Sequence, residues 1–170
     1  MQSIPMLKLL LSYEYLDPNV GTSSGATPLH FAAMQGLREE AKILIEDPRI
    51  DIESIQVNSD YIGATPLHFA AMQAQVEIVR MLLEKNANVH ATISKGIYAG
   101  FTPLHFAVMN FDTIHVFETI KLLFLAGADM KCKAASGQRP SDLTSVNVIQ
   151  KFLEHPDKSY TLKQNNRSVR

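Results

Sequence analysis

The hexapeptide TPLHFA decides the fold, and it is written three times, at residues 27–32, 65–70 and 102–107. Thr27 and Thr65 are 38 positions apart, and Thr65 and Thr102 are 37 apart, so one unit is repeated in tandem with small insertions. A period of about 20 to 50 residues is typical of architectures in which each unit covers its apolar face only with its neighbours. The sequence therefore predicts a stack of small units within one domain, residues 1–156.

Each unit is expected to contain two helices packed as an antiparallel pair. Threonine followed by proline is a helix-start signal, because proline at the first helical position gives up an amide that has no intrahelical partner. Gly36 ends the first such helix, and LREEAKILIE then places its apolar residues on one helical face. The expected first helices are 28–35, 66–73 and 103–110, and the expected second helices are 37–46, 76–85 and 113–126.

Both ends of the array read as partial units. MLKLLLSY (residues 6–13) predicts a second helix without a first, and the stretch before Pro18 ends it. Near the other end the motif restarts with Arg139-Pro140, where arginine replaces threonine. Atypical sequence is expected at terminal caps. The predicted units are an N-terminal cap (1–24), three full repeats (25–62, 63–99 and 100–136), a degenerate C-terminal cap (137–156) and a disordered tail (157–170).

GATPLHFAAMQG, a second helix that ends in LLE, and the turns NANVH and LAGADM resemble the ankyrin-repeat family over roughly residues 6–155. The resemblance implies an all-α ankyrin-repeat solenoid of stacked helix-turn-helix units with β-hairpin fingers. It also implies protein binding by the fingers and the inner helices. The units exceed the usual period of about 33 residues. The first two units carry four extra residues each in their fingers, and the third carries four between its helices, around NFDTIHV.

The polar residues of the motif are expected to be structural rather than chemical. Adjacent helices in a stack lie about 8–10 Å apart, whereas Zn–N bonds are about 2.0–2.1 Å, so equivalent histidines of neighbouring units cannot share a metal ion. We therefore expect no metal and no cofactor. The recurring phenylalanines, Phe31, Phe69 and Phe106, are expected to be buried between units. The expected structural residues of the motif are Thr27, His30, Thr65, His68, Thr102 and His105.

Candidate partner-binding residues lie where the copies end and in the long fingers. Methionine adapts to irregular partners, so a Met stripe bordered by amides is a candidate recognition strip; the alternative is that each Met fills space against its own finger. Two tyrosines occupy the same position of the two long fingers, and they either form a hot spot or brace the fingers. The candidates are Met34, Gln35, Tyr61, Met72, Gln73, Tyr98, Met109 and Asn110.

No catalytic constellation is evident from the sequence. Cys132 lies between Lys131 and Lys133, which predicts a lowered thiol pKa, but no partner histidine is suggested by position, and an exposed, incidental thiol is the favoured interpretation. The chain has no glycine-rich phosphate loop, no CxxC pair and no HExxH motif. We therefore expect a protein that is not an enzyme and has no small-molecule substrate.

Composition agrees with a protein partner. The formal charge of −1 makes nucleic acid an unlikely partner, although the basic residues of the tail motivate it as an alternative. Residues 6–11 are too short an apolar stretch for the roughly 20 residues of a membrane span, and a secretory signal is not evident. The single cysteine favours an intracellular, cytoplasmic location.

The sequence thus predicts a protein–protein interaction module, an adaptor or scaffold that binds through its concave inner-helix face and long fingers. Two alternatives stay open. The chain is an ankyrin-type effector secreted by an intracellular microbe, or it is a targeting fragment of a larger enzyme or membrane protein.

Overall fold

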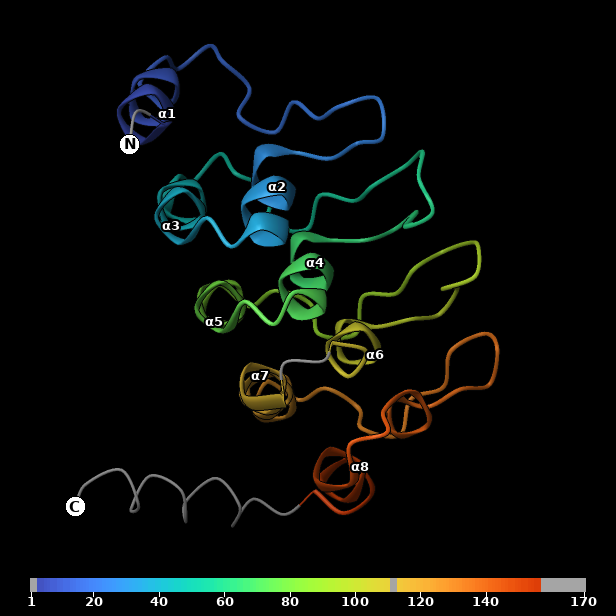
Figure 1. The fold of residues 1–170 in the computed structure, drawn as a ribbon. Coiled ribbons are helices and arrows are strands. Elements are labelled where there is room, and N and C mark those ends of the chain that lie inside the picture. The colour runs from blue at the N-terminus through green and yellow to red at the C-terminus, as the bar shows by residue number, and fades with distance from the viewer. Residues whose placement is uncertain (1–2, 111–112, 157–170) are drawn as a thin grey trace, which may run out of the picture.

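The computed structural model describes residues 3–110 and 113–156, and within these ranges every regular element is a helix. Figure 1 shows the helices stacked in two columns, with long loops, the fingers, projecting to one side. The inner column contains α2 (Pro28–Gln35), α4 (Pro66–Met72), α6 (Pro103–Ala107) and the short 3₁₀ helix η1 (Pro140–Leu143). The outer helices are α1 (Ser3–Leu11), α3 (Arg38–Glu46), α5 (Val76–Glu84), α7 (Thr113–Leu125) and α8 (Asn147–Glu154).

The inner helices begin where the TP dipeptides predict. Thr27, Thr65 and Thr102 have extended backbone and precede proline at the start of each helix. The motif leucines and alanines are buried, and α2 packs on α4 as α4 packs on α6. Small alanine side chains let these helices lie close together. The repeated motif therefore forms the spine of the stack.

The outer helices add the second half of one continuous core. In α5, Ile78, Val79 and Leu82 are buried, while Glu77 and Glu84 face solvent. This is the amphipathic pattern expected of a helix that covers a core with one face. α1 packs on α3, α3 on α5 and α5 on α7. The predicted helix pairs and their order along the chain are confirmed.

The fingers are closed by backbone hydrogen bonds, although the described residues contain no strand, so their predicted β-hairpin form is not confirmed. In the first long finger the Gln56 N–H donates to the Ala64 carbonyl at 3.0 Å, and the Gly63 N–H donates back to Gln56 at 2.8 Å. The Ser94 N–H of the next finger donates to the Ile62 carbonyl at 2.7 Å. Neighbouring fingers are thereby tied to each other as well as to their helices.

Two glycines allow this close contact between fingers. Gly63 and Gly100 have φ angles of 94° and 79°, in the left-handed region that side chains avoid. A Cβ atom on Gly100 would lie 2.6 Å from the Ala135 nitrogen of the following finger. Glycine is needed at this position both for its conformation and for the approach of the next backbone.

The extra residues of the third unit lie around the junction of its two helices, where they lengthen α7. α6 has only 5 residues and α7 has 13, against 9 in α5. When the outer helices are aligned at their ends, Val76 matches Phe117, so α7 begins one turn early. Phe111 and Asp112, in the connection, lie outside the described residues. The last unit is abbreviated, because its first helix is the four-residue η1.

The expectation that all three motif phenylalanines are buried is wrong for one of them. Phe69 and Phe106 are 4% and 2% exposed, but Phe31 is 38% exposed. Phe69 packs edge-on against His30 of the preceding unit, and Phe106 packs in the same way against His68. Within the described chain only α1 precedes α2, and α1 packs on α3. Phe31 therefore has no preceding inner helix to cover it.

Two further expectations concern the chain as a whole. The predicted disordered tail, residues 157–170, lies outside the described residues. Among the helices that the structure describes, none is long and apolar enough to cross a membrane.

Candidate interaction surface

Each motif histidine links its own turn to the next unit. The Thr27 N–H donates to Nδ1 of His30 at 3.2 Å, and the Thr27 hydroxyl lies 2.9 Å from the same nitrogen. On its other side the Nε2–H of His30 donates to the Ala64 carbonyl at 3.1 Å. Because a carbonyl only accepts, Nε2 carries the proton and Nδ1 is the acceptor. The neutral imidazole is the form that satisfies both contacts.

The same arrangement recurs in the other two copies. Nδ1 of His68 accepts from the Thr65 N–H at 3.1 Å, and its Nε2–H donates to the Phe101 carbonyl at 3.3 Å. His105 connects Thr102, again at 3.1 Å, with the Gln138 carbonyl at 3.3 Å. The three histidines therefore connect four consecutive units by hydrogen bonds.

Burial also sets the protonation of these histidines. It lowers the pKa of His68 to about 4, and it lowers the pKa of His30 and His105 as well. The charged form loses its hydration in the core, whereas the hydrogen bond to the next unit's carbonyl partly offsets that loss. The described residues contain no group of three or more histidine, cysteine or acidic side chains placed to hold a metal ion.

The environment of Cys132 differs from the one that its neighbours in the sequence predict. The predicted lowering of its pKa by Lys131 and Lys133 is wrong, because burial of the half-buried thiol raises the pKa. Position also failed to suggest a histidine neighbour, yet Sγ lies 3.8 Å from Nδ1 of His105 and 3.8 Å from Oγ1 of Thr102. The same nitrogen accepts the Thr102 N–H at 3.1 Å, and the pKa of the thiol is raised by burial rather than lowered.

The two finger tyrosines lie against each other and against the core. The Tyr61 and Tyr98 rings are stacked, with centroids 5.4 Å apart and an angle of 6° between their planes. Tyr61 also meets Phe69 at 5.7 Å, and both tyrosines meet Phe106. Both side chains are half-buried. This geometry is the one expected of rings that brace two neighbouring fingers, and it leaves part of each ring accessible.

The residues after the motif divide into exposed and engaged ones. Met72 is half-buried against the core, and the half-buried Asn110 donates from Nδ2 to the Met72 carbonyl at 2.9 Å. The others are exposed and lie on the inner helices or directly after them. Together with the exposed Phe31 they define a surface that we call the inner-helix strip: Phe31, Met34, Gln35, Gln73 and Met109.

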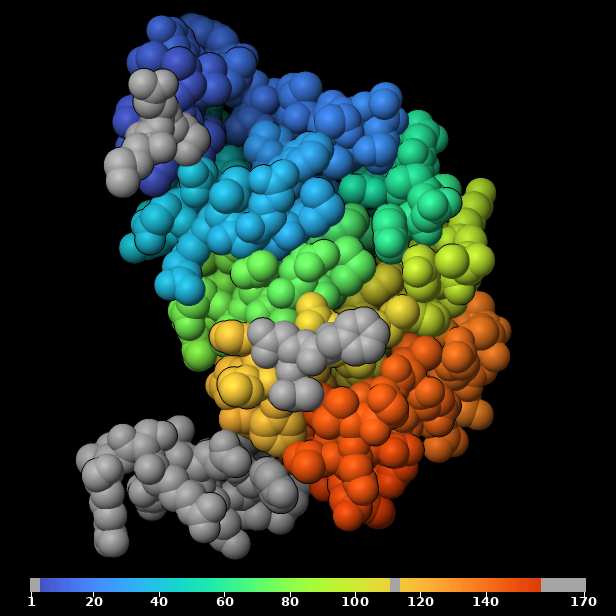
Figure 2. Space-filling model, in the orientation of Figure 1, coloured from blue at the N-terminus to red at the C-terminus, as the bar shows by residue number. Residues whose placement is uncertain are grey.

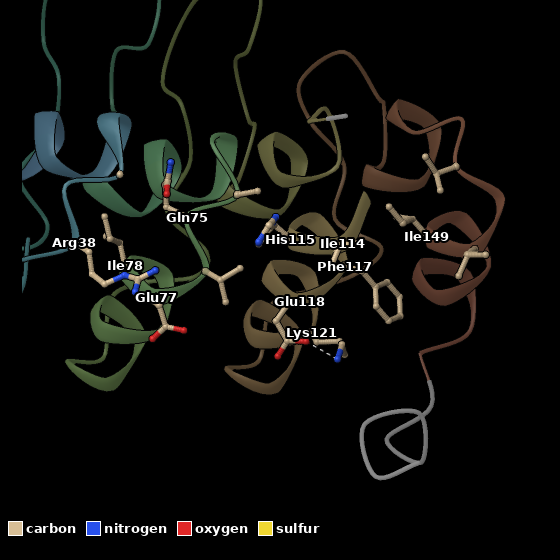
Figure 3. Close-up of a pocket in the computed structure, with 15 residues that line it drawn as sticks. Arg38, Gln75, Glu77, Ile78, Ile114, His115, Phe117, Glu118, Lys121 and Ile149 are labelled. Atoms are coloured by element: carbon tan, nitrogen blue, oxygen red, sulfur yellow. Dashed lines mark ion pairs between the residues drawn. The ribbon is translucent and has the colours of Figure 1, made fainter. Parts of the chain in front are cut away.

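A second surface, which the sequence did not suggest, lies where inner helices turn into outer ones. This turn-side groove encloses about 820 Å³ and is lined by the α4–α5 turn and the first turns of α5, α7 and α8. Figure 3 shows Ile114, Phe117 and Ile149 on its α7 and α8 side and Gln75, Glu77 and Ile78 on the opposite side. Ile114 is 78% exposed.

The rim of the groove carries charges of both signs. Lys121 Nζ lies 2.6 Å from Glu118 Oε2 and 5.4 Å from the centroid of the Phe117 ring, while Arg38 and Glu77 lie at the other edge. The sequence signal that could have indicated this groove is the four-residue excess of the third unit, because that excess forms the extra turn of α7 that carries Ile114 and His115. The position of the excess was predicted, but no surface was assigned to it.

The comparisons with known proteins agree with this geometry. A family model described as ankyrin repeats in three copies matches residues 2–93 and residues 63–134. A search of curated proteins found no match to the chain.

Proposed function

Because the chain belongs to the ankyrin-repeat family, a family of protein-interaction folds without catalysis of their own, we propose that it is an adaptor or scaffold that binds a partner protein through its inner-helix strip. The two long fingers flank that strip. The observation that carries the proposal is the exposure of large apolar side chains on the inner helix α2 and directly after the inner helix α6: Phe31 at 38%, Met34 at 36% and Met109 at 38%.

The chemistry of the strip suits a protein surface of mixed character. Methionine side chains are flexible and polarisable, so Met34 and Met109 adapt to irregular apolar contacts. The amides of Gln35 and Gln73 donate and accept hydrogen bonds without the desolvation cost of a full charge. Such a strip favours a partner that presents apolar side chains among polar backbone groups, for example a loop or a helix.

The remaining candidate residues support the strip from behind. Tyr61 and Tyr98 hold the long fingers beside it, Met72 fills the space beneath it, and Asn110 fixes the end of the α6 turn to α4. Two aliphatic side chains of the fingers, Ile55 at 49% and Ile97 at 80% exposed, extend the apolar surface beyond the helices. We assign the tyrosines primarily a bracing role, with their exposed edges at the border of the contact.

The cellular setting is part of the proposal rather than of the geometry. A cytoplasmic adaptor, an effector delivered by an intracellular microbe and a targeting module within a larger protein all use the same binding surface. A formal charge of −1 disfavours a polyanionic partner, so the proposal does not extend to nucleic acid. Binding whose affinity falls steeply with salt would reverse that assignment.

The proposal is tested by affinity capture with the intact chain as bait and quantitative mass spectrometry of the captured proteins. The strip variant is Met34→Lys, Gln73→Glu and Met109→Lys. Two matched variants place the same number of surface changes elsewhere: Gln75→Glu, Ile114→Lys and Val148→Lys in the turn-side groove, and Lys42→Ala, Glu46→Ala and Glu84→Ala on the outer helices.

The strip variant is expected to lose partners that both matched variants retain, with the far-ultraviolet circular dichroism and the Tm of all variants close to those of the unmodified chain. Partners that survive the strip variant and disappear with the groove variant would move the binding site to the turn-side groove. Partners that survive all three variants would refute a site on either surface.

A further inference from the structure

The fingers present one position of the repeat in the same way three times. At this position the backbone N–H donates to the side-chain oxygen of the aspartate or asparagine two residues earlier. The three donors are Glu53, to Asp51 at 2.9 Å, His90, to Asn88 at 2.9 Å, and Lys131, to Asp129 at 2.8 Å. Three equivalent positions therefore carry an acidic side chain in the first finger, an imidazole in the second and a basic side chain in the third.

The remaining charges of these three fingers follow the same order along the chain. The fingers comprise residues 47–65, 85–102 and 126–139. The first finger has four carboxylates, and among the described residues only that of Asp47 is in an ion pair, with Arg49 at 2.7 Å. The second finger has no carboxylate and carries Lys95 near its tip, whereas the third carries three basic residues and one aspartate. The formal charge therefore changes from negative to positive after the first finger.

These charged side chains form a row along one edge of the molecule. Figure 2 shows the three fingers along that edge in chain order, in teal, yellow-green and orange. Backbone hydrogen bonds from Ser94 to Ile62 and from Ala135 to Ala99, at 2.7 and 2.9 Å, join neighbouring fingers. Apart from the half-buried Glu53, the charged side chains are exposed. The acidic end of the row is Asp51, Glu53 and Asp60, and the basic end is Lys95, Lys131, Lys133 and Arg139.

The inner-helix strip runs along the stack in the same direction as this change of charge. The strip extends from α2, which carries Met34, to the end of α6, which Met109 follows two residues later. Adjacent helices of a stack lie about 8–10 Å apart, so the first and third fingers are separated by roughly 16–20 Å. A segment that lies along the strip therefore meets the acidic end of the row at one of its own ends and the basic end at the other.

We propose that the segment of the partner protein that binds here is bipolar, with basic side chains at one end, apolar side chains in the middle and acidic side chains at the other end. This inference rests on the proposed binding through the inner-helix strip. The basic end of the segment lies on the acidic end of the row, and its acidic end lies on the basic end of the row. The reversed orientation places like charges together, so charge selects both the partner and its direction.

The charge match is tested with two synthetic peptides of about 16 residues, which span roughly 24 Å as a helix. Both contain the same lysine, leucine, alanine and glutamate residues. In the bipolar peptide the lysines form one end and the glutamates the other, whereas in the mixed peptide the two kinds alternate. Fluorescence anisotropy with the full chain at low salt is expected to show about 5- to 30-fold tighter binding of the bipolar peptide. This preference is expected to disappear at about 1 M salt, where charges are screened within about 3 Å.

Removing charges from the acidic end is expected to reduce the preference for the bipolar peptide. The variant is Glu53→Gln with Asp60→Asn. The glutamine keeps a side-chain oxygen for the Asn88 N–H, which donates to the Glu53 carboxylate at 2.7 Å in the unmodified chain. The bipolar peptide is expected to bind this variant less than about threefold more tightly than the mixed peptide does.

The basic end is tested in the same way, with a control on the outer helices. Lys131→Gln with Lys133→Gln removes two charges from the basic end and is expected to reduce the preference to less than about threefold. Lys42→Gln with Lys151→Gln removes as many positive charges from α3 and α8 and is expected to leave the preference unchanged. An equal loss in this control would show that net charge, rather than its position, decides the binding, and would overturn the proposal.

The predicted direction is tested by nuclear magnetic resonance of the full chain with a nitroxide label on the bipolar peptide. A label at the lysine end is expected to broaden the amide signals of residues 55–62 in the first finger. A label at the glutamate end is expected to broaden those of residues 131–137 in the third finger. Broadening in the opposite order would overturn the proposed orientation.

The remaining outcomes separate this proposal from that of the inner-helix strip. Equal binding of the two peptides, or no measurable binding of either, overturns the bipolar partner. The strip variant Met34→Lys, Gln73→Glu and Met109→Lys is expected to weaken both peptides; unchanged affinities in it would count against the strip while leaving the charge preference to be judged by the end variants. An average mass that rises above 18.9 kDa with concentration, and does so only while Lys131 and Lys133 are present, would assign the row to a second copy and overturn a separate partner.

Discussion

The buried histidines predict a specific dependence of stability on pH, and His68 is the site where its size can be worked out. His68 is 2% exposed and keeps a pKa of about 4 in the folded chain, against 6.5 when unfolded. The folded-state pKa is therefore the lower one, and the unfolded chain binds the extra proton as the pH falls below 6.5. The stability contribution of His68 is therefore fully present above pH 6.5, falls as the pH drops from 6.5 to about 4, and changes no further below that range.

The magnitude follows from the linkage relation. One proton taken up only by the unfolded chain changes the free energy of unfolding by about 1.4 kcal/mol per pH unit. Between pH 7.5 and 5.5, His68 alone then accounts for a loss of about 1.3 kcal/mol. His30 and His105, whose pKa values are also lowered, add to the loss in the same direction.

The assay is urea unfolding at pH 7.5, 6.5 and 5.5 for the unmodified chain and for His68→Gln. Glutamine keeps an N–H donor for the Phe101 carbonyl but has no titrating group and leaves the Thr65 N–H without its acceptor. At pH 7.5 the variant is expected to be about 1–3 kcal/mol less stable. This difference is expected to shrink by about 1.3 kcal/mol at pH 5.5, with unchanged m-values. Parallel pH dependences of the two proteins would refute a buried, neutral His68.

Three further predictions follow from the packing. Phe106→Ala is expected to lower the free energy of unfolding by about 3–5 kcal/mol. Phe31→Ala, at the same motif position, should lower it by under about 2 kcal/mol, because Phe31 is already 38% exposed. Equal losses in chemical denaturation would contradict the exposure of Phe31. A double-mutant cycle of Tyr61→Ala and Tyr98→Ala should give a coupling free energy of about 0.5–1.5 kcal/mol between the stacked rings. Tyr61→Phe and Tyr98→Phe, which keep the rings, serve as controls. Zero coupling would argue against the bracing role. Arg49→Ala should increase the rate of amide hydrogen exchange in α1 much more than in α3, because it removes the hydrogen bonds to the Leu11 and Tyr13 carbonyls. Unchanged exchange in α1 would show that its apolar contacts suffice to hold it in place.

The repeated motif made most of the fold predictable. TPLHFA combines a helix-start signal, a buried leucine and small alanines in six residues, so local and tertiary requirements coincide at each copy. The order of the helices and the region of the third unit that holds its extra residues followed from that alignment. Helix ends shifted by one to three residues, for example in α6, because tertiary packing rather than the motif decides where a short helix stops.

The surfaces were harder to predict, because exposure depends on which neighbours a residue has. Phe31 and Phe69 occupy the same motif position, but Phe69 packs against His30 of the preceding unit and against Tyr61 of the preceding finger, whereas Phe31 is 38% exposed. Cys132 looked exposed between two lysines, yet the fold brings it to His105, 27 positions away. The turn-side groove needs three helix starts from separate units, and no single stretch of sequence contains that arrangement.

The most direct test of the proposed function is site-specific photo-crosslinking in cells from which the partner is captured. A photoreactive amino acid is placed at Met34 or Met109 of the inner-helix strip, at Ile114 of the turn-side groove, or at Glu84 of an outer helix. The proposal predicts that Met34 and Met109 cross-link to the same partner protein and that Ile114 and Glu84 do not. Cross-links to a shared partner from Ile114 or Glu84, with none from Met34 and Met109, would contradict binding through the inner-helix strip.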